Sequence, residues 1–272
     1  MAETPRYALA LSDAEIARYR MMAEMARADE AAEWNRAGII AGARIIDIGC
    51  GPGLIAIELA QIGGPTGRVV AVDREADAVE TARSLLHERG FDNVEVRVAD
   101  AWSTGLDENS FDVVNIRHVL AHNTAVDQIR ILEHARALLA PGGTVFIVDS
   151  DMTGMRIDPP DADLTDLNDR YAAYLASVGR DPQCGTTLGS LVAGAGFELV
   201  ERGATFFMLG PETATIRLPG WAARDAMIAS GHATAADVDR WDTALTRFAE
   251  DGEGGNSARF VPRYWAIGRK PR

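Results

Sequence analysis

The segment at residues 43–53 constrains the fold of the chain more than any other, because it joins an apolar run to a glycine-rich turn. The run at residues 45–48 is typical of a short buried strand, and residues 54–61 have the pattern of a helix. Glycines without a Cβ atom let a ligand approach the backbone, and N–H groups at the helix start are expected to face it. The turn contains Gly49, Gly51 and Gly53.

This turn is compatible with two kinds of nucleotide-derived cofactor. Residues 51–56 satisfy the G-x-G-x-x-G/A pattern of dinucleotide-binding proteins, which supports an NAD(P)-dependent oxidoreductase. Two features argue against that interpretation. Asp47 lies inside the strand just before the glycines, and the turn has one glycine more than a dinucleotide loop needs.

Further strands and helices follow in alternation. A second apolar strand at residues 69–72 ends at Asp73, 20 residues after Gly53, where an acidic side chain can accept hydrogen bonds from ribose hydroxyls. Five strands alternate with helices over residues 43–151, which predicts an α/β fold with a doubly wound parallel sheet. Ligands on such sheets bind beyond the carboxyl ends of the strands. The segments expected there are Asp47–Gly53, Asp73, Asp100, Arg117–His122 and Asp149–Asp151.

Outside these strands the chain adds helices and an antiparallel strand pair. We divide the whole chain into an N-terminal helical extension at 1–42, the sheet core at 43–151 and a C-terminal part at 152–272. The C-terminal part contains strands near 199–209 and 263–269 and two helical cap insertions, at 152–180 and 211–256.

A helix is expected over residues 13–35, which precede the first strand. One interpretation is that it packs against the sheet edge or against a second copy in a homo-oligomer. The other is that it forms a flap over the cofactor, with Tyr7 or Tyr19 touching the ligand.

The heptapeptide from Asp47 to Gly53 resembles motif I of the class I S-adenosylmethionine (SAM) methyltransferases. The segment at 111–143 is similar to small-molecule enzymes of the ubiquinone/menaquinone type. The resemblance implies a seven-stranded, mostly parallel, Rossmann-like sheet and SAM as cofactor. It also implies that Asp100 accepts from the adenine amino group and that His118 lies beside the cofactor. The cofactor-binding residues expected are Asp47, Gly49, Cys50, Gly51, Gly53, Asp73, Arg74, Asp100, Ala101, Trp102, Arg117 and His118.

Methyl transfer from a sulfonium is an in-line displacement, so positioning and exclusion of water supply much of the acceleration. A base is needed only if the acceptor loses a proton. His122, after the fourth strand, is the first candidate and His118 the second, since imidazoles titrate near neutrality. The alternative for His122 is a polar residue hydrogen-bonded at a strand–helix junction. Asp151 is either a base or part of the pocket wall.

The acceptor pocket is expected to have an aromatic and aliphatic lining, although each of these side chains also suits a core. The residues expected there are Phe206, Trp221, Met227 and Tyr171. Tyr171 and Tyr174 are expected to pack in the core, with the pocket lining as the second interpretation. Cys50 is interpreted as a small residue that fits a crowded turn.

Other classes of function fit the sequence less well. The formal charge of −13 disfavours nucleic acid and anionic membranes as partners. The segment Asp158-Pro-Pro-Asp161 follows the fifth strand. The similar Pro-Pro motif of DNA methyltransferases comes directly after the fourth strand, so the resemblance to those enzymes is not supported. His118 and His122 lack the glutamate of H-E-x-x-H and a third ligand, so no metal is expected.

Two cysteines, no signal peptide and no 18-residue apolar run favour a cytoplasmic, soluble protein. A SAM-binding protein without methyl transfer remains a third interpretation.

Overall fold

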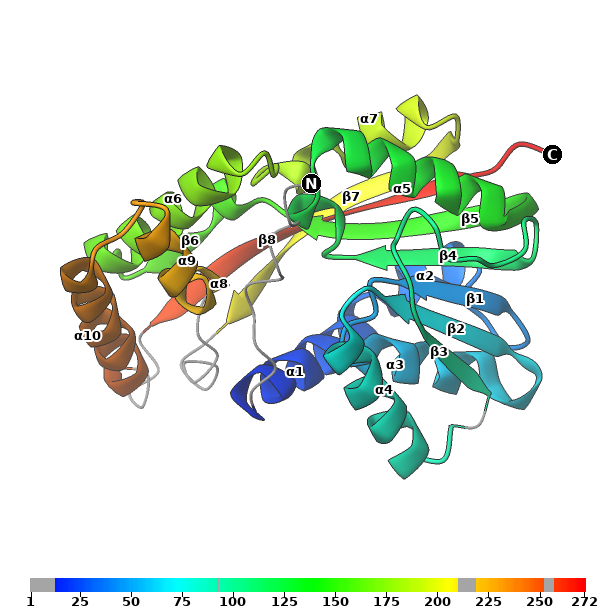
Figure 1. Cartoon of the computed structure of the whole chain (residues 1–272), viewed down its shortest axis with the longest axis horizontal. Coiled ribbons are helices and arrows are strands. Elements are labelled where there is room, and N and C mark those ends of the chain that lie inside the picture. Colours follow the sequence, from blue (N-terminus) through cyan, green and yellow to red (C-terminus); the bar gives the residue numbers. More distant parts are fainter. Residues whose placement is uncertain (1–12, 92, 210–218, 252–256) are drawn as a thin grey trace.

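An eight-stranded sheet runs through the computed structural model, which describes residues 13–91, 93–209, 219–251 and 257–272 (Figure 1). The strand order is β3-β2-β1-β4-β5-β8-β6, and β7 pairs with β8 outside this path. Strands β1 to β5 are parallel, whereas β8 is antiparallel to β5, β6 and β7. The strands are β1 Arg44–Ile48, β2 Arg68–Asp73, β3 Val94–Val98, β4 Phe111–Arg117, β5 Leu139–Ser150, β6 Arg156–Asp158, β7 Glu198–Leu209 and β8 Ala258–Arg269.

The predicted fold, a mostly parallel sheet with an antiparallel closing pair, is confirmed. Two details differ from the prediction. The structure adds the short strand β6 within the insertion at 152–180, which was expected to be helical, because Arg156 to Asp158 pair with the first residues of β8. Strand β5 is also long and begins at Leu139, which already pairs with Phe111 of β4.

Helices cover both faces of the sheet (Figure 1). Helices α1, α3 and α4 lie on one face and α5 and α7 on the other, each above an apolar cluster. Alternate residues of β1 serve the two clusters: Ile45 packs on the α3 side, and Ile46 and Ile48 on the α5 side. The helices are α1 Asp13–Asp29, α2 Ala31–Arg36, α3 Leu54–Gly63, α4 Ala76–Glu88, α5 Ala125–Leu138 and α7 Cys184–Gly194.

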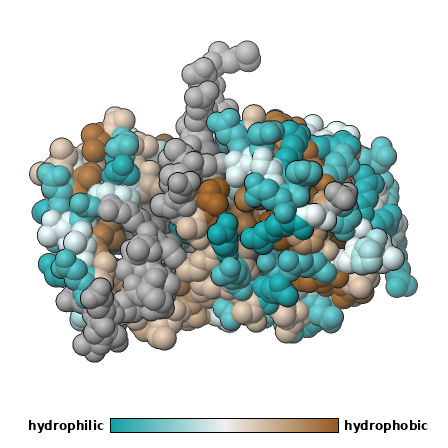
Figure 2. Space-filling model, turned by 90° about the horizontal axis from the view of Figure 1, so that it is seen from below, coloured by the Kyte–Doolittle hydropathy of each residue, from teal (hydrophilic) through white to brown (hydrophobic). Residues whose placement is uncertain are grey.

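The outer surface of these helices is mainly polar. In Figure 2, hydrophilic side chains cover much of the half of the face that carries α3 and α4. No helix in the described ranges is long and apolar enough to cross a membrane.

The N-terminal segment forms two helices instead of the one expected over 13–35. Helix α1 ends at Asp29, and Glu30 separates it from α2 with a non-helical backbone. The Glu30 carboxylate is fully buried and contacts Arg117 of β4 and Arg263 of β8. The break therefore turns a carboxylate inward to meet two buried guanidinium groups.

The remaining helices form a cap beyond β6 and the start of β8 (Figure 1). They share a third apolar cluster, separate from the two under the sheet, which includes Trp241, Leu164 and Met227. The Trp241 indole donates to Asp166 at 3.1 Å and joins two of these helices. The cap helices are α6 Ala162–Ser177, α8 Pro219–Ala222, α9 Arg224–Ala229 and α10 Ala235–Asp251.

Gly53 packs the glycine turn against α4. Its φ is +80°, and a Cβ atom there would lie 2.8 Å from the Cβ of Ala82. Both the backbone conformation and the lack of space require glycine.

We expect Gly53→Ala to destabilise the protein by roughly 2–4 kcal/mol, because left-handed backbone strain and overpacking add. Gly63→Ala is the matched control, since Gly63 ends α3 with φ −60° and has no atom within 4 Å of the added Cβ. The control should leave stability unchanged or raise it by up to about 1 kcal/mol. Urea unfolding of both variants measures the difference, and equal stabilities would refute the packing role of Gly53.

Candidate active site

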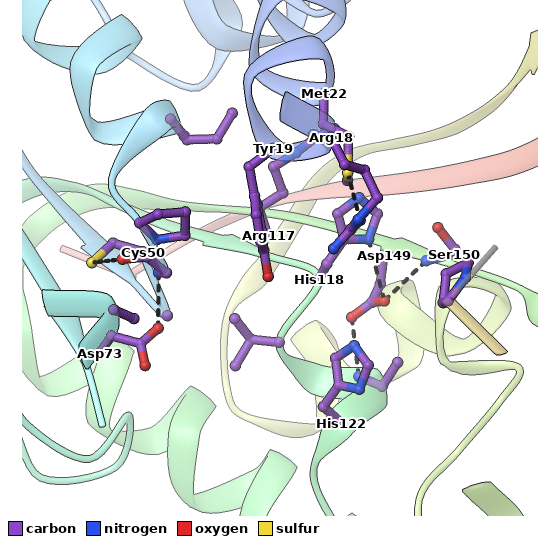
Figure 3. A pocket seen from close by; sticks show the side chains of 18 of the residues that line it. Arg18, Tyr19, Met22, Cys50, Asp73, Arg117, His118, His122, Asp149 and Ser150 are labelled. Carbon is purple, nitrogen blue, oxygen red and sulfur yellow. Dashed lines mark hydrogen bonds and ion pairs between the residues drawn. The ribbon is translucent and has the colours of Figure 1, made fainter. Parts of the chain in front are cut away.

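A cavity of about 960 Å³ lies beyond the carboxyl ends of the parallel strands (Figure 3). Its wall includes the turns after β1, β2, β3, β4 and β5, the inner side of α1, and residues of α6, β7 and β8. The predicted site residues on this wall are Asp47, Gly49, Cys50, Gly51, Asp73, Arg74, Ala101, Trp102, Arg117, His118, His122 and Asp151.

Two residues expected to bind the cofactor lie elsewhere. Gly53 packs beneath the turn on Ala82 and does not reach the wall. Asp100 is exposed, and its backbone forms an isolated bridge with Ser103 instead of lining the cavity.

The glycine turn is bonded to the end of β2. The amides of Gly49 and Cys50 both donate to the carbonyl of Val72, at 2.8 and 3.0 Å. The Gly51 amide donates to the Asp73 carboxylate at 2.8 Å. Protein oxygens therefore already accept from these three amides of the turn, which come before the helix start at Leu54.

Gly49 makes a second close contact, which is possible only because glycine has no side chain. Its φ is +76°, and a Cβ atom would lie 2.3 Å from Val119, which follows β4. The loop after β4 thus packs directly on the turn. Burial raises the pKa of the Cys50 thiol well above its usual value, so the thiol is neutral and packs within the turn.

Carboxylates dominate the end of the cavity beside this turn. Asp47 is buried and accepts from the Asn115 amide at 2.7 Å, while its second oxygen has no hydrogen-bond partner among the described residues. Burial raises the pKa of Asp47 to about 7, the hydrogen bond from Asn115 opposes this, and the nearby charge of Asp73 adds to it. Glu75 and Asp77 lie on the same wall.

Asp73 connects β2 to both neighbouring loops. Its two oxygens accept from the amides of Gly51 and Glu75, at 2.8 and 3.0 Å. Burial raises its pKa, and these backbone bonds oppose the shift. A carboxylate has about four acceptor positions, so Asp73 keeps capacity for further donors. A ligand with a positive charge and hydroxyl groups suits this end of the cavity better than a pyrophosphate, which needs free amides.

Two histidines and Asp149 form the centre of the cavity (Figure 3). Asp149 is buried at the end of β5 and accepts from the amides of Ala121 and Ser150, each at 3.0 Å. The His118 Nδ1 atom lies 3.8 Å from an Asp149 oxygen. His118 has φ +53°, a left-handed conformation rare for residues other than glycine, which sequence reasoning does not foresee.

Both imidazoles are kept neutral. Burial lowers the pKa of His118, and its contact with Asp149 opposes the shift. Burial lowers the pKa of His122 further, to about 4. At neutral pH both rings therefore retain a nitrogen that can accept a proton. Among the described residues, no group of three His, Cys, Asp or Glu side chains is placed to hold a metal ion.

Asp151 is a less suitable base. One of its oxygens accepts from the amide and the hydroxyl of Thr153, at 2.8 and 2.7 Å, and so caps the short helix Met152–Gly154. Its position on the wall is explained by this capping role.

The opposite end of the cavity is mainly apolar, although Arg18 and Arg259 also line the cavity wall. Tyr171 lies there as predicted, and burial raises its pKa to about 12. The sequence analysis did not identify most of the other residues of this wall. Two patterns could have indicated them: the methionines at helical spacing in α1 and the alternation of apolar side chains along β7. The apolar wall is formed by Met22, Met25, Met152, Met155, Tyr171, Leu175, Phe207, Leu209 and Val261.

Three of the expected lining residues are corrected by the structure. Phe206 is 64% exposed, because alternate side chains of β7 point to opposite faces and Phe207 takes the inner position. Met227 and Trp221 pack in the apolar cluster of the cap, as does Tyr174. Tyr19 of α1 does line the cavity, in agreement with the flap interpretation, whereas Tyr7 lies outside the described residues.

Comparison with known proteins identifies the class of this site. A family model described as "Methyltransferase domain" matches residues 39–193, more than half of the chain. The protein belongs to this family, and the predicted class, a SAM-dependent methyltransferase domain on a Rossmann-like sheet, is confirmed.

Three relatives illustrate the similarity. The chain is 31% identical over 143 residues to the ubiquinone/menaquinone biosynthesis C-methyltransferase UbiE of Hahella chejuensis, a match that covers 50% of this chain and 57% of that protein. A candidate methyltransferase from Bacillus halodurans C-125 has a TM-score of 0.59 at 20% identity, covering 90% of this chain and all of that one. The Haemonchus contortus phosphoethanolamine N-methyltransferase 2, in complex with S-adenosylhomocysteine, has a TM-score of 0.53 at 18% identity. The match covers 88% of this chain and 53% of that one.

The solved structures at these identities show the fold alone. The chain spans about half the length of the curated relatives that it matches.

The buried carboxyl of Asp47 predicts a pH dependence of stability in the ligand-free protein. Its folded pKa of about 7 exceeds the usual value of 3.8, so the folded state binds the extra proton between these values. This contribution is therefore present at low pH and is lost as the pH rises through 7, at roughly 1.4 kcal/mol per pKa unit.

The two buried histidines act in the opposite direction, because their lowered pKa values cost stability as the pH falls. The difference between wild type and Asp47→Asn isolates the Asp47 term. We expect the stability advantage of Asp47→Asn to grow from pH 4.5 to pH 7.5 in chemical denaturation. A difference that stays constant over this range contradicts the raised pKa.

Proposed function

We propose that the protein transfers a methyl group from SAM to an apolar small molecule bound beneath the cap. The observation that carries this proposal is the asymmetry of the cavity. Carboxylates beside a glycine turn occupy one end, an apolar wall occupies the other, and two neutral histidines lie between them.

The residues at the carboxylate end fit SAM. The buried second oxygen of Asp47 suits a donor with positive charge, such as the amino group of the cofactor. Asp73 has remaining acceptor positions for the ribose hydroxyls. Arg74, Ala101 and Trp102 lie on the wall nearby and are assigned to the adenosine portion.

SAM supplies a methyl group on a sulfonium, whose departure leaves a neutral thioether. The protein therefore needs mainly to hold the acceptor in line and to exclude water. We assign acceptor binding to the apolar wall, with Tyr171, Phe207 and Met25 among its members. The helical segment at 13–35 and the described parts of the insertions at 152–180 and 211–256 are assigned as the roof of this pocket.

His122 is assigned as the proton acceptor for substrates that lose a proton on methylation. Its low pKa keeps the imidazole neutral, and it lines the cavity after β4. Asp149 lies close enough to raise the pKa of both histidines, so it favours the protonated ring that forms during transfer. His118, nearest Asp149, is assigned to cofactor contact.

The rival interpretation, an NAD(P)-dependent oxidoreductase, has less support. The amides of Gly49, Cys50 and Gly51 donate to protein oxygens and are not available to a pyrophosphate. Carboxylates on the same wall would also repel it.

Isothermal titration calorimetry with SAM and S-adenosylhomocysteine tests the proposed cofactor. Both ligands should bind, and Asp73→Asn should weaken S-adenosylhomocysteine by roughly tenfold or more, because charge-assisted hydrogen bonds are lost. Asp112→Asn is the matched control, since Asp112 pairs with Arg44 at the amino ends of β4 and β1, away from the cavity. If NADH binds and neither SAM nor S-adenosylhomocysteine does, the proposed cofactor is wrong.

The role of His122 is tested with a panel of apolar phenols and amines, by following S-adenosylhomocysteine formation. For phenols, which lose a proton, His122→Gln should lower kcat roughly 100-fold or more and leave SAM affinity unchanged. An equal loss for all acceptors would assign His122 to packing instead. If SAM binds but no acceptor yields S-adenosylhomocysteine, the protein is better described as a SAM-binding protein without methyl transfer.

A further inference from the structure

A buried cluster of three charged side chains joins helices α1 and α2, which we call the lid helices, to the cavity. Glu30, between α1 and α2, is fully buried, and one of its oxygens contacts a guanidinium nitrogen of Arg117. The same oxygen lies 2.6 Å from a guanidinium nitrogen of Arg263, which is also fully buried. Arg263 donates in addition to the Thr205 hydroxyl of the neighbouring strand at 3.0 Å. We call Glu30, Arg117 and Arg263 the arginine cluster.

The arginine cluster carries an excess positive charge. Two guanidinium groups, which stay protonated in proteins, share one carboxylate. In the part of the chain that the structure describes, no other carboxylate lies within 4.0 Å of either guanidinium. Uncompensated charge in a poorly solvated environment is costly, so an anion placed next to the cluster is strongly favoured.

Only one member of the arginine cluster can meet such an anion. Arg117 lines the cavity, with 7% of its side chain accessible, whereas Arg263 and Glu30 lie behind the wall. An anionic ligand would therefore touch Arg117. Arg263 would act from behind by sharing the charge of Glu30, which leaves Arg117 with unneutralised charge.

Arg117 lies at the carboxylate end of the cavity. It is the last residue of β4, which pairs with β1 so that Asn115 stands opposite Asp47. The positive charge of Arg117 also lowers the pKa of Asp47, which places the two groups within electrostatic reach. Asp47, which can bind a cation, and Arg117, which can bind an anion, therefore lie close together. This arrangement suits a zwitterionic amino-acid group.

We propose that the arginine cluster is the binding site for the carboxylate of the cofactor's amino-acid portion, with Arg117 as the contact residue and Arg263 as the positioning residue. This inference rests on the proposed function. Since Glu30 lies at the break between α1 and α2, the same contacts link cofactor binding to the position of the lid. An acidic group on the methyl acceptor is the other source of a carboxylate, and the ligands below separate the two.

The test compares two ligands that differ in the amino-acid portion. S-adenosylhomocysteine carries the amino and carboxylate groups, and 5′-deoxy-5′-methylthioadenosine lacks them. Their affinities are measured by calorimetry for wild type, Arg117→Met and Arg263→Met. Arg27→Met is the control, because Arg27 pairs at 3.2 Å with Glu58 where α1 packs on α3, outside the cavity.

Each cluster variant should weaken S-adenosylhomocysteine by about tenfold or more, which corresponds to about 1.4 kcal/mol. The affinity for methylthioadenosine should change by less than about twofold, which is a small part of the change in binding free energy expected for S-adenosylhomocysteine. The control should alter neither ligand. Arg117→Met leaves a one-to-one pair of Glu30 and Arg263, so it decides the question alone if Arg263→Met fails to fold.

Equal losses for both ligands would overturn the inference and assign the arginine cluster to folding. Unchanged affinities would also overturn it and would leave the acceptor as the source of an anion at Arg117. If wild type binds neither ligand, the proposed cofactor itself is wrong, so the two failures are distinguishable.

Discussion

The hydrogen bonds between the glycine turn and the end of β2 determine the character of the whole site. The Val72 carbonyl and the Asp73 carboxylate together accept from three consecutive amides of the turn. These bonds hold the turn close enough to the loop after β4 that Gly49 has no room for a side chain. They also leave the amides of Gly49, Cys50 and Gly51 unavailable to an anion. Side chains are therefore expected to recognise much of the ligand, and the wall carries both carboxylates and the guanidinium groups of Arg74 and Arg117.

Burial then sets the chemistry of these groups. Asp47 and the two histidines are all held nearer to neutrality than they would be in water, because the cavity excludes solvent. The buried guanidinium of Arg117 acts in the opposite sense and favours the charged form of Asp47. A site of this kind gains most from a ligand that carries charges of both signs, since each buried group then finds a partner.

The sequence predicted the parallel strands and the residues at the carboxylate end of the cavity because both depend on local patterns. Strand alternation and the turn glycines are visible in the chain itself, and Asp47 and Asp73 lie at strand ends. The acceptor wall was less predictable, since it is formed by distant segments that meet only in three dimensions. Phe206 and Phe207 are adjacent in sequence, and only the register of β7 decides which one faces inward. The arginine cluster likewise joins residues from three separate elements, and no local pattern marks it.

The central claim is that the carboxylate end of the cavity binds SAM and the apolar end binds the acceptor. A crystal structure with S-adenosylhomocysteine tests it most directly. The account predicts ribose hydroxyls on Asp73, the amino group beside Asp47, and the sulfur atom turned toward Tyr171 and the apolar wall. Adenosine bound among the methionines, with Asp47 and Asp73 left without ligand contacts, would contradict it.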